Sequence, residues 1–128
     1  MMLTITPAYA ALLGVLFLVL SARVITWRRS RKIALGDWSD PEMVKRARVH
    51  GNFAEYAPFG LVLVVLVELK EAPTLLVHVL AAALLTGRFL HAAAFAFQSQ
   101  ILAFRVAGMV LTTTSIGASA AVLLVLSF

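Results

Sequence analysis

Four long apolar segments, separated by short polar stretches, dominate the chain. They cover about residues 5–27, 41–69, 73–97 and 101–127. A helix needs roughly 20 apolar residues to cross the hydrocarbon core of a bilayer, and each segment is that long. Because lipid offers the backbone no hydrogen-bond partners, such segments cross it as helices. The pattern predicts an all-α membrane protein, a four-transmembrane-helix bundle in which residues 1–128 form a single domain.

Prolines and polar residues mark the ends of these segments. Asp40, Pro41 and Glu42 follow the order of an N-cap, a proline at the first helical position and an acid in the first turn. Pro73 suits the start of the third helix. The polar stretch 98–100 predicts a tight connection between the third helix and the fourth.

Composition supports a membrane location and limits the possible chemistry. Hydrophobic residues make up 62% of the chain, whereas soluble domains contain roughly 45–50%. The chain has no cysteine, which excludes disulfides, a thiol nucleophile of its own and cysteine-ligated metal. Any thiol chemistry must therefore use a sulfur that a substrate supplies. The histidines do not share a ligand spacing, so no metal site is predicted.

The basic residues are concentrated between the first two apolar segments. The formal net charge is +5, and this part of the chain contains Arg28, Arg29, Arg31, Lys32, Lys45, Arg46 and Arg48. The positive-inside rule predicts that such a loop is cytoplasmic. This distribution favours a topology signal over a nucleic-acid-binding patch. We therefore expect an integral, multi-pass membrane protein with loop 28–48 in the cytoplasm and both termini on the other side.

Polar residues within the helices fall at a similar depth near the cytoplasmic side. Arg48, Asn52 and Glu55 have the spacing i, i+4 and i+7, which places them on one helix face. The other helices contribute Arg28, Arg29, Arg88, His91 and Arg105 to the same layer. Ionisable groups at membrane depth indicate a functional site. Several cations with a single acid suit a small anionic ligand that carries an amine, and an arginine can also stabilise a thiolate.

Each of these residues also has a structural interpretation. The arginines can contact lipid headgroups instead, and Arg28 and Arg29 are the clearest candidates. Glu55 and Arg88 can form an ion pair between helices, since buried charges pair whether or not a ligand is present. His91 can be an ordinary packed helix residue. The sequence leaves both interpretations open.

The second helix carries a motif that resembles a known family signature. The motif is R-x-H-x-N-x-x-E-Y-x-P, formed by Arg48, His50, Asn52, Glu55, Tyr56 and Pro58. It resembles the second-helix signature of the MAPEG superfamily, the membrane-associated proteins in eicosanoid and glutathione metabolism. The chain length, the four helices, the basic first loop and the charged third helix are also similar to that family.

The resemblance implies a homotrimer with glutathione bound between neighbouring subunits near the cytoplasmic face. The positions that match the family's glutathione-binding residues are Arg29, Arg48, His50, Asn52, Glu55, Tyr56, Arg88 and His91. Arg28 competes with Arg29 for the position that closes the first helix. Arg105 resembles the fourth-helix arginine that activates the thiol, although its register is shifted.

Two departures point to the bacterial members of the family. Phe95 stands where eukaryotic members have a tyrosine, and Gly51 replaces a larger or basic residue of some members. Both changes argue against the eukaryotic lipid substrates. The short chain and short loops are more similar to the bacterial members, which implies a location in the bacterial inner membrane.

The activity implied by the resemblance is that of a glutathione-dependent membrane transferase or peroxidase. Glutathione is the co-substrate, and its thiolate, stabilised by Arg105, attacks a lipophilic electrophile or hydroperoxide that enters from the membrane lipids. A non-catalytic lipid-binding or scaffold member of the same family is the alternative. A small four-helix drug exporter is disfavoured, because the first helix lacks a membrane-embedded carboxylate and the arginines would repel cationic drugs.

Overall fold

The computed structural model describes residues 2–96 and 101–128, and within these ranges it contains α-helices and no β-strand. The helices are α1 (Thr6–Ser30), α2 (Pro41–Leu69), α3 (Thr74–Ala93) and α4 (Leu102–Val125). All four are long and apolar enough to cross a membrane. The predicted all-α architecture is therefore confirmed for the described residues. The predicted connection at 98–100 and residue 97 lie outside them.

Helix ends differ from the predicted bounds in two places. α1 continues to Ser30, past the expected end near residue 27, so that Arg28 and Arg29 lie in its last turn. Cations are favourable there because the carbonyl end of a helix carries partial negative charge. α3 ends earlier than expected, at Ala93, and the chain then turns, with the backbone N–H of Phe95 donating to the Ala92 carbonyl at 3.2 Å.

Asp40 caps α2 as the sequence predicted. Its carboxylate accepts a hydrogen bond from the backbone N–H of Met43 at 2.8 Å, and Pro41 follows at the first helical position. This hydrogen bond lowers the pKa of Asp40 from its ordinary value. The indole N–H of Trp27 also donates to Asp40, at 3.3 Å. The same carboxylate therefore starts α2 and connects it to the end of α1.

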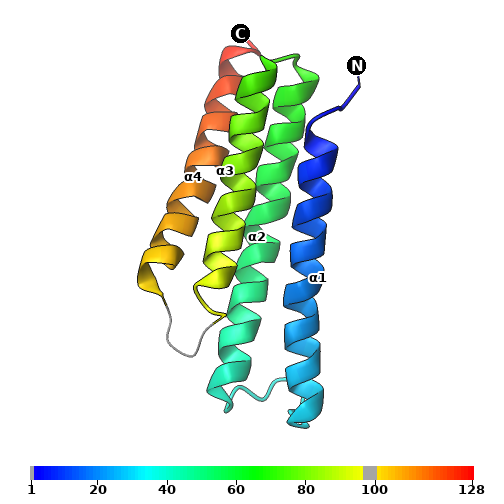
Figure 1. Ribbon diagram of the computed structural model, residues 1–128, viewed down its shortest axis with the longest axis vertical. Helices are drawn as coiled ribbons and strands as arrows, with labels where there is room; N and C mark the ends of the chain where they lie inside the picture. The colour runs from blue at the N-terminus through cyan, green and yellow to red at the C-terminus, as the bar shows by residue number, and fades with distance from the viewer. Residues whose placement is uncertain (1, 97–100) are drawn as a thin grey trace.

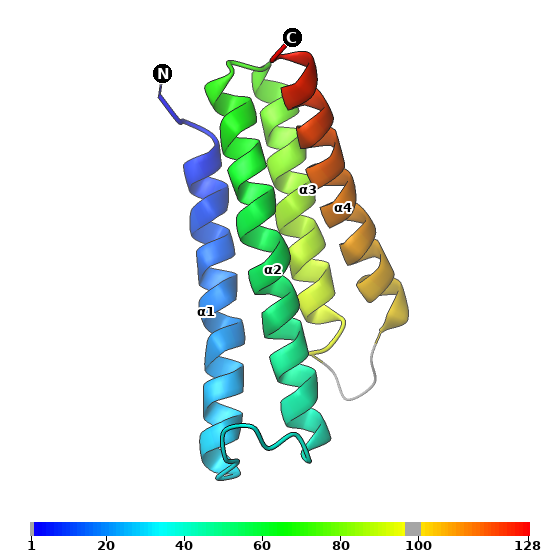
Figure 2. The same ribbon diagram turned by 180° about the vertical axis from the view of Figure 1, so that it is seen from behind.

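Successive helices run in opposite directions along one bundle, and both termini lie at the same end (Figure 1). The loop between α1 and α2 lies at the other end, where these two helices extend past the end of α3 and the start of α4 (Figures 1 and 2). By the positive-inside rule this extended end is the cytoplasmic one.

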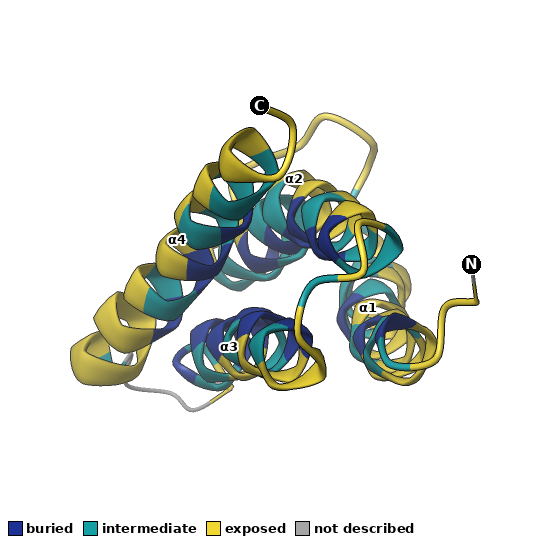
Figure 3. Cartoon of the chain, turned by 90° about the horizontal axis from the view of Figure 1, so that it is seen from above, coloured by how far each residue is buried: buried dark blue, intermediate teal, exposed yellow. Residues whose placement is uncertain are grey.

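Packing is uneven among the helices. α3 and α4 pack most extensively, and α1 contacts α2 and α3 but, within the described residues, not α4. Seen from the end of the bundle, the buried faces of α2, α3 and α4 turn inward, whereas α1 is mostly exposed (Figure 3). Its buried residues are Thr6, Leu13 and Leu20. Exposed apolar residues such as Leu12, Val15 and Leu18 are compatible with contact to lipid.

At the outer end, Glu68 of α2 caps the start of α1. One carboxylate oxygen accepts from the backbone N–H groups of Thr4 at 2.7 Å and Ile5 at 2.8 Å, and the other accepts from Thr6 at 2.8 Å. α1 has no cap from a side chain of its own. An acid at a helix N-terminus satisfies free N–H groups and is favoured by the helix dipole. Glu68 therefore joins the first two helices.

Candidate functional site

Arg88 of α3 is the centre of the polar cluster inside the bundle. It is 1% exposed. Its Nη1 donates to the side-chain oxygen of Asn52 at 2.7 Å, and its Nε donates to the Thr112 hydroxyl at 2.9 Å. Its Nη2 donates to the Met109 sulfur at 3.3 Å. The guanidinium carbon lies 5.4 Å from the centre of the Tyr56 ring, within cation–π range.

A close contact between the α3 and α4 backbones makes this cluster possible. A Cβ atom on Gly108 would lie 2.6 Å from the backbone nitrogen of His91 and 2.7 Å from the backbone oxygen of Gly87. A Cβ atom on Gly87 would lie 2.6 Å from the Thr112 hydroxyl. Larger residues at either glycine would push the helices apart. The two glycines therefore let Thr112 reach the side chain of Arg88.

The hydrogen-bond roles of Thr112 are determined by its partners. The hydroxyl has one proton, which it donates to the Gly108 carbonyl at 2.8 Å. Its oxygen is then free to accept from Arg88 Nε, which is the contact observed. Thr112 is fully buried and helps to orient the guanidinium through this contact.

Arg48 and Arg105 line an open groove between α2 and the start of α4. The groove has a volume of about 310 Å³, and Lys45 and Phe95 also line it. The guanidinium carbon of Arg105 lies 5.7 Å from the centre of the Phe95 ring. The other neighbour of Phe95 is the buried His91, with 5.4 Å between the ring centres. Phe95 therefore lies between the groove and the helix face that carries Arg88.

Glu55 is exposed and has no hydrogen bond or ion pair among the described residues. The interhelical ion pair between Glu55 and Arg88 that the sequence allowed is therefore absent. Asn52, one helical turn before Tyr56, takes the contact with Arg88 instead. Arg88 thus has only neutral hydrogen-bond partners in the described part of the chain.

His50 and Arg29 lie away from this cluster. The Nε2 atom of His50 lies 3.0 Å from the hydroxyl of Ser21 on α1, and its imidazole ring lies 5.0 Å from the Phe17 ring. Ser21 donates its single proton to the Phe17 carbonyl at 2.9 Å. The His50 Nε2 atom must therefore be the donor in the contact with Ser21. Arg29 is exposed in the last turn of α1.

An apolar groove runs between α1 and α2 at the depth of the bundle core. Its volume is about 310 Å³. The residues that line it are small or apolar: Ala10, Leu13, Gly14, Phe17, Phe53, Ala54, Ala57, Pro58 and Leu61. This apolar lining favours contact with a hydrocarbon chain.

Comparison with known proteins assigns the family. The model of the MAPEG family matches residues 6–125. The chain belongs to the MAPEG family. It is 32% identical over 105 residues to the inner membrane protein YecN of Escherichia coli strain K12, covering 82% of this chain and 79% of YecN. YecN of Escherichia coli O6:H1, strain CFT073, matches with the same identity and coverage. No solved structure matches the chain.

Membership of the MAPEG family confirms the resemblance drawn from the second-helix motif. With the four apolar helices and an inner-membrane relative, it identifies the chain as a multi-pass inner-membrane protein. The name of the relative gives a location and no activity. The activity of this MAPEG chain is therefore inferred from the residues and geometry of its site.

Three residues of the Arg88 cluster were missed in the sequence: Gly87, Met109 and Thr112. A signal for Thr112 was present in the apolar fourth segment. Gly108, Thr112 and Ser115 lie at i, i+4 and i+7, so these small residues share one helix face, and all are buried against α3. That spacing predicts a close helix contact. The register between Arg88 and Thr112 depends on the α3–α4 connection and could not be read from either helix alone.

Proposed function

We propose that this MAPEG chain is a glutathione-dependent membrane transferase or peroxidase. The observation that carries the proposal is the buried Arg88, whose hydrogen-bond partners among the described residues are all neutral. A buried cation without a counter-charge is costly, and an anionic ligand would offset that cost. Glutathione supplies two carboxylates and one ammonium group.

Met109 is the partner that a carboxylate would replace. A thioether sulfur is a weak acceptor, and the methionine side chain is unbranched and flexible. Of the three hydrogen bonds that Arg88 donates, the one from Nη2 to the Met109 sulfur, at 3.3 Å, has the weakest acceptor. When glutathione enters, one carboxylate oxygen takes this position, while Asn52 and Thr112 keep the guanidinium in place.

The remaining groups of glutathione suit the neighbouring charges. The unpaired carboxylate of Glu55 would bind the ammonium group, and Arg48 would bind the second carboxylate. Arg105, which lines the same groove as Arg48, would stabilise the thiolate by its positive charge.

In the transferase reaction the thiolate sulfur forms a bond to an electrophilic carbon, from which a leaving group departs. In the peroxidase reaction it forms a bond to the terminal oxygen of the hydroperoxide, the O–O bond breaks, and the released alkoxide takes up a proton to become the alcohol. A second glutathione then converts the resulting glutathione sulfenic acid to glutathione disulfide and water.

A homotrimer would complete this site. Arg29 and His50 match glutathione-binding positions of the family, yet in one chain they lie on the α1 side, away from Arg88. A neighbouring subunit could present both residues to glutathione bound at Arg88. The apolar groove between α1 and α2 would hold the lipophilic substrate.

The test is turnover by the purified protein in detergent or lipid. We expect glutathione-dependent conjugation of a generic aryl halide or reduction of a lipid hydroperoxide, with a rate that saturates in glutathione. Glutathione-independent product, or no product from either substrate, would contradict the proposal.

The apolar groove between α1 and α2 supports the alternative, a non-catalytic lipid-binding protein, because no arginine among the described residues lines this groove. This alternative would be favoured if a fatty acid bound to the protein while neither substrate turned over.

A further inference from the structure

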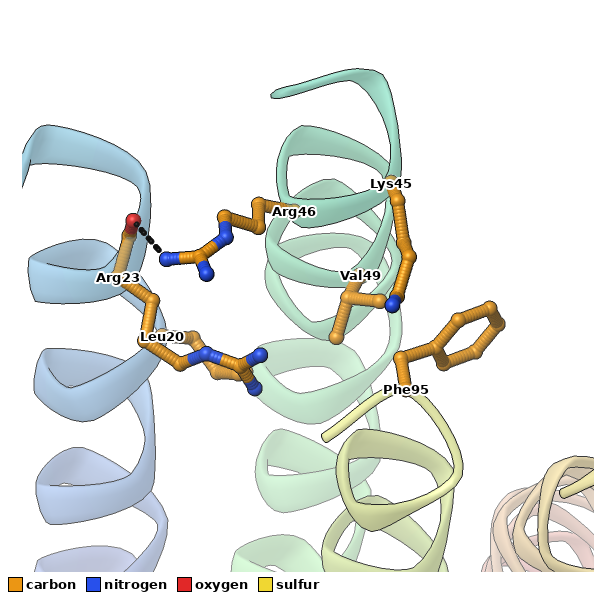
Figure 4. A pocket seen from close by; sticks show the side chains of 6 residues that line it. All are labelled: Leu20, Arg23, Lys45, Arg46, Val49 and Phe95. Atoms are coloured by element: carbon orange, nitrogen blue, oxygen red, sulfur yellow. Dashed lines mark hydrogen bonds between the residues drawn. The ribbon is translucent and has the colours of Figure 1, made fainter. Parts of the chain in front are cut away.

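A second group of cations lies between α1, α2 and the end of α3, apart from the Arg88 cluster. It surrounds a small pocket lined by Leu20, Arg23, Lys45, Arg46, Val49 and Phe95 (Figure 4). α3 has ended at this level, whereas α1 and α2 continue toward the cytoplasmic end (Figure 1). The pocket therefore lies in the corner that the shorter helix leaves.

Arg23 turns its charge into this corner. Figure 4 shows its side chain running from α1 toward Val49 and Phe95. Arg23 is half-buried, and its side chain makes no hydrogen bond or ion pair with any described residue. A guanidinium has five N–H donors and is always charged near neutral pH. All of these donors are available to a ligand.

Arg46 and Lys45 share one carboxylate. Arg46 Nε donates to Glu42 at 2.8 Å, and Lys45 Nζ lies 3.3 Å from the other oxygen of Glu42. Arg46 Nη1 also donates to the backbone carbonyl of Arg23 at 3.1 Å (Figure 4). Three cations thus line the pocket, and Glu42 is the acid that pairs with two of them, Lys45 and Arg46, in the described part of the chain. Their mutual repulsion is relieved when an anion binds.

The pocket has room for one atom of such an anion. Its free volume is about 10 Å³, which corresponds to roughly one water-sized sphere. Leu20 and Val49, each 4% exposed, form apolar walls that lower the local dielectric and strengthen charge interactions. One oxygen of a phosphate fits this space, and the rest of the group remains at the pocket mouth.

We propose that Arg23, Lys45 and Arg46 form a binding site for a phosphate-type oxyanion. Two sources offer this chemistry at the cytoplasmic surface: the headgroup of an acidic phospholipid and free inorganic phosphate. Lys45 also lines the groove assigned to glutathione, but Arg23 and Arg46 do not. The tests therefore act on Arg23, so that a failure of this proposal can be told apart from a failure of the proposed function.

The lipid arm of the test uses native mass spectrometry of the full chain with added phosphatidylglycerol or phosphatidylcholine. We expect Arg23→Gln to weaken phosphatidylglycerol binding by about 10-fold, since it removes a charge-assisted contact. Lys32→Gln is the control, because it also removes one positive charge, from an exposed position in the loop that follows α1. We expect it to change the affinity less than about twofold.

The phosphate arm follows thermal unfolding of delipidated protein in neutral detergent as inorganic phosphate is added at constant ionic strength. An Arg23-dependent rise in Tm identifies free phosphate as a ligand, whereas Arg23 dependence in the lipid arm alone identifies the phospholipid. Equal losses in Arg23→Gln and Lys32→Gln, or no Arg23 dependence in either arm, would overturn the proposal.

Folding of the variant is checked without any added anion. Arg23→Gln removes repulsion and no hydrogen bond, so its Tm in phosphatidylcholine should equal or exceed that of the native chain. Arg23→Lys keeps the charge without the planar fork and should retain part of the binding. Full loss of binding in Arg23→Lys together with a lowered Tm in both variants would show a structural role for Arg23 and contradict the site.

Discussion

Two carboxylates of α2, Glu68 at the outer end and Glu55 nearer the cytoplasmic end, have opposite surroundings. At the outer end, Glu68 is surrounded by the backbone N–H groups of Thr4, Ile5 and Thr6 and serves as a helix cap. At the cytoplasmic end, Glu55 and Arg48 are exposed and make no contact of this kind with the other described residues. The charge of Glu68 is therefore satisfied by hydrogen bonds within the chain, whereas the charges of Glu55 and Arg48 are not.

Arg88 differs from both Glu55 and Arg48 because its charge is buried and not exposed to solvent. Exposed charges at the cytoplasmic end are stabilised by water and headgroups, but a guanidinium that is 1% exposed is not. Its neutral partners Asn52 and Thr112 orient it without neutralising it. Arg88 is therefore the charge that the proposed glutathione would neutralise, and variants at both ends of the bundle test this role.

The largest effect is expected for Arg105. Arg105→Ala should lower the turnover number about 100- to 1000-fold while changing glutathione affinity little, because its charge acts on the thiolate in the reacting complex. Arg48→Ala should instead weaken glutathione binding, measured by calorimetry. The reverse pattern in these two variants would exchange their roles.

Arg88→Met should separate binding from stability. The variant should weaken glutathione binding at least about 30-fold, because the ligand carboxylate loses its buried partner. In the ligand-free protein the Tm should be unchanged or higher, since replacing an unneutralised buried charge with an apolar side chain of similar length is often stabilising. A large drop in Tm with unchanged glutathione binding would show that Arg88 is purely structural.

Thr112 should act through Arg88 alone. Thr112→Val preserves shape but removes the hydroxyl that accepts from Arg88 Nε, so glutathione affinity should fall about 10-fold. Thr112→Ser keeps the hydroxyl and should restore most of the affinity. Equal affinities in the two variants would exclude this positioning role.

Glu68→Gln should produce the smallest effect, and only at the outer end. The amide keeps one acceptor oxygen but loses the charge and the second acceptor for the start of α1. We expect a loss of about 1 kcal/mol in stability, seen as a lower Tm, with unchanged glutathione affinity. A change in affinity without a change in Tm would contradict the separation of the two ends.

Local signals in the sequence were sufficient to predict the helices and the cap of α2. Apolar length and the order Asp40, Pro41, Glu42 depend on neighbouring residues, and both predictions are confirmed. The cap of α1 was missed because Glu68 is distant in sequence from Thr4–Thr6. No pattern within either segment reveals such a contact.

The contacts among the candidate site residues were harder to predict than their types. The spacing of Arg48, Asn52 and Glu55 predicts one face of α2, but it could not show that Asn52, rather than Glu55, contacts Arg88. The choice depends on the rotation of α3 relative to α2, which no pattern within either helix reveals. In the same way, the contact of His50 with Ser21 depends on the rotation of α2 relative to α1.

The most direct test of a ligand for the unneutralised Arg88 is calorimetric titration of the purified chain with glutathione and with glutathione diethyl ester, whose carboxylates are blocked. We expect glutathione to bind with a Kd in the millimolar range or tighter and the ester to bind at least about 10-fold more weakly. No binding of glutathione at millimolar concentration, or equal binding of the two compounds, would contradict this prediction.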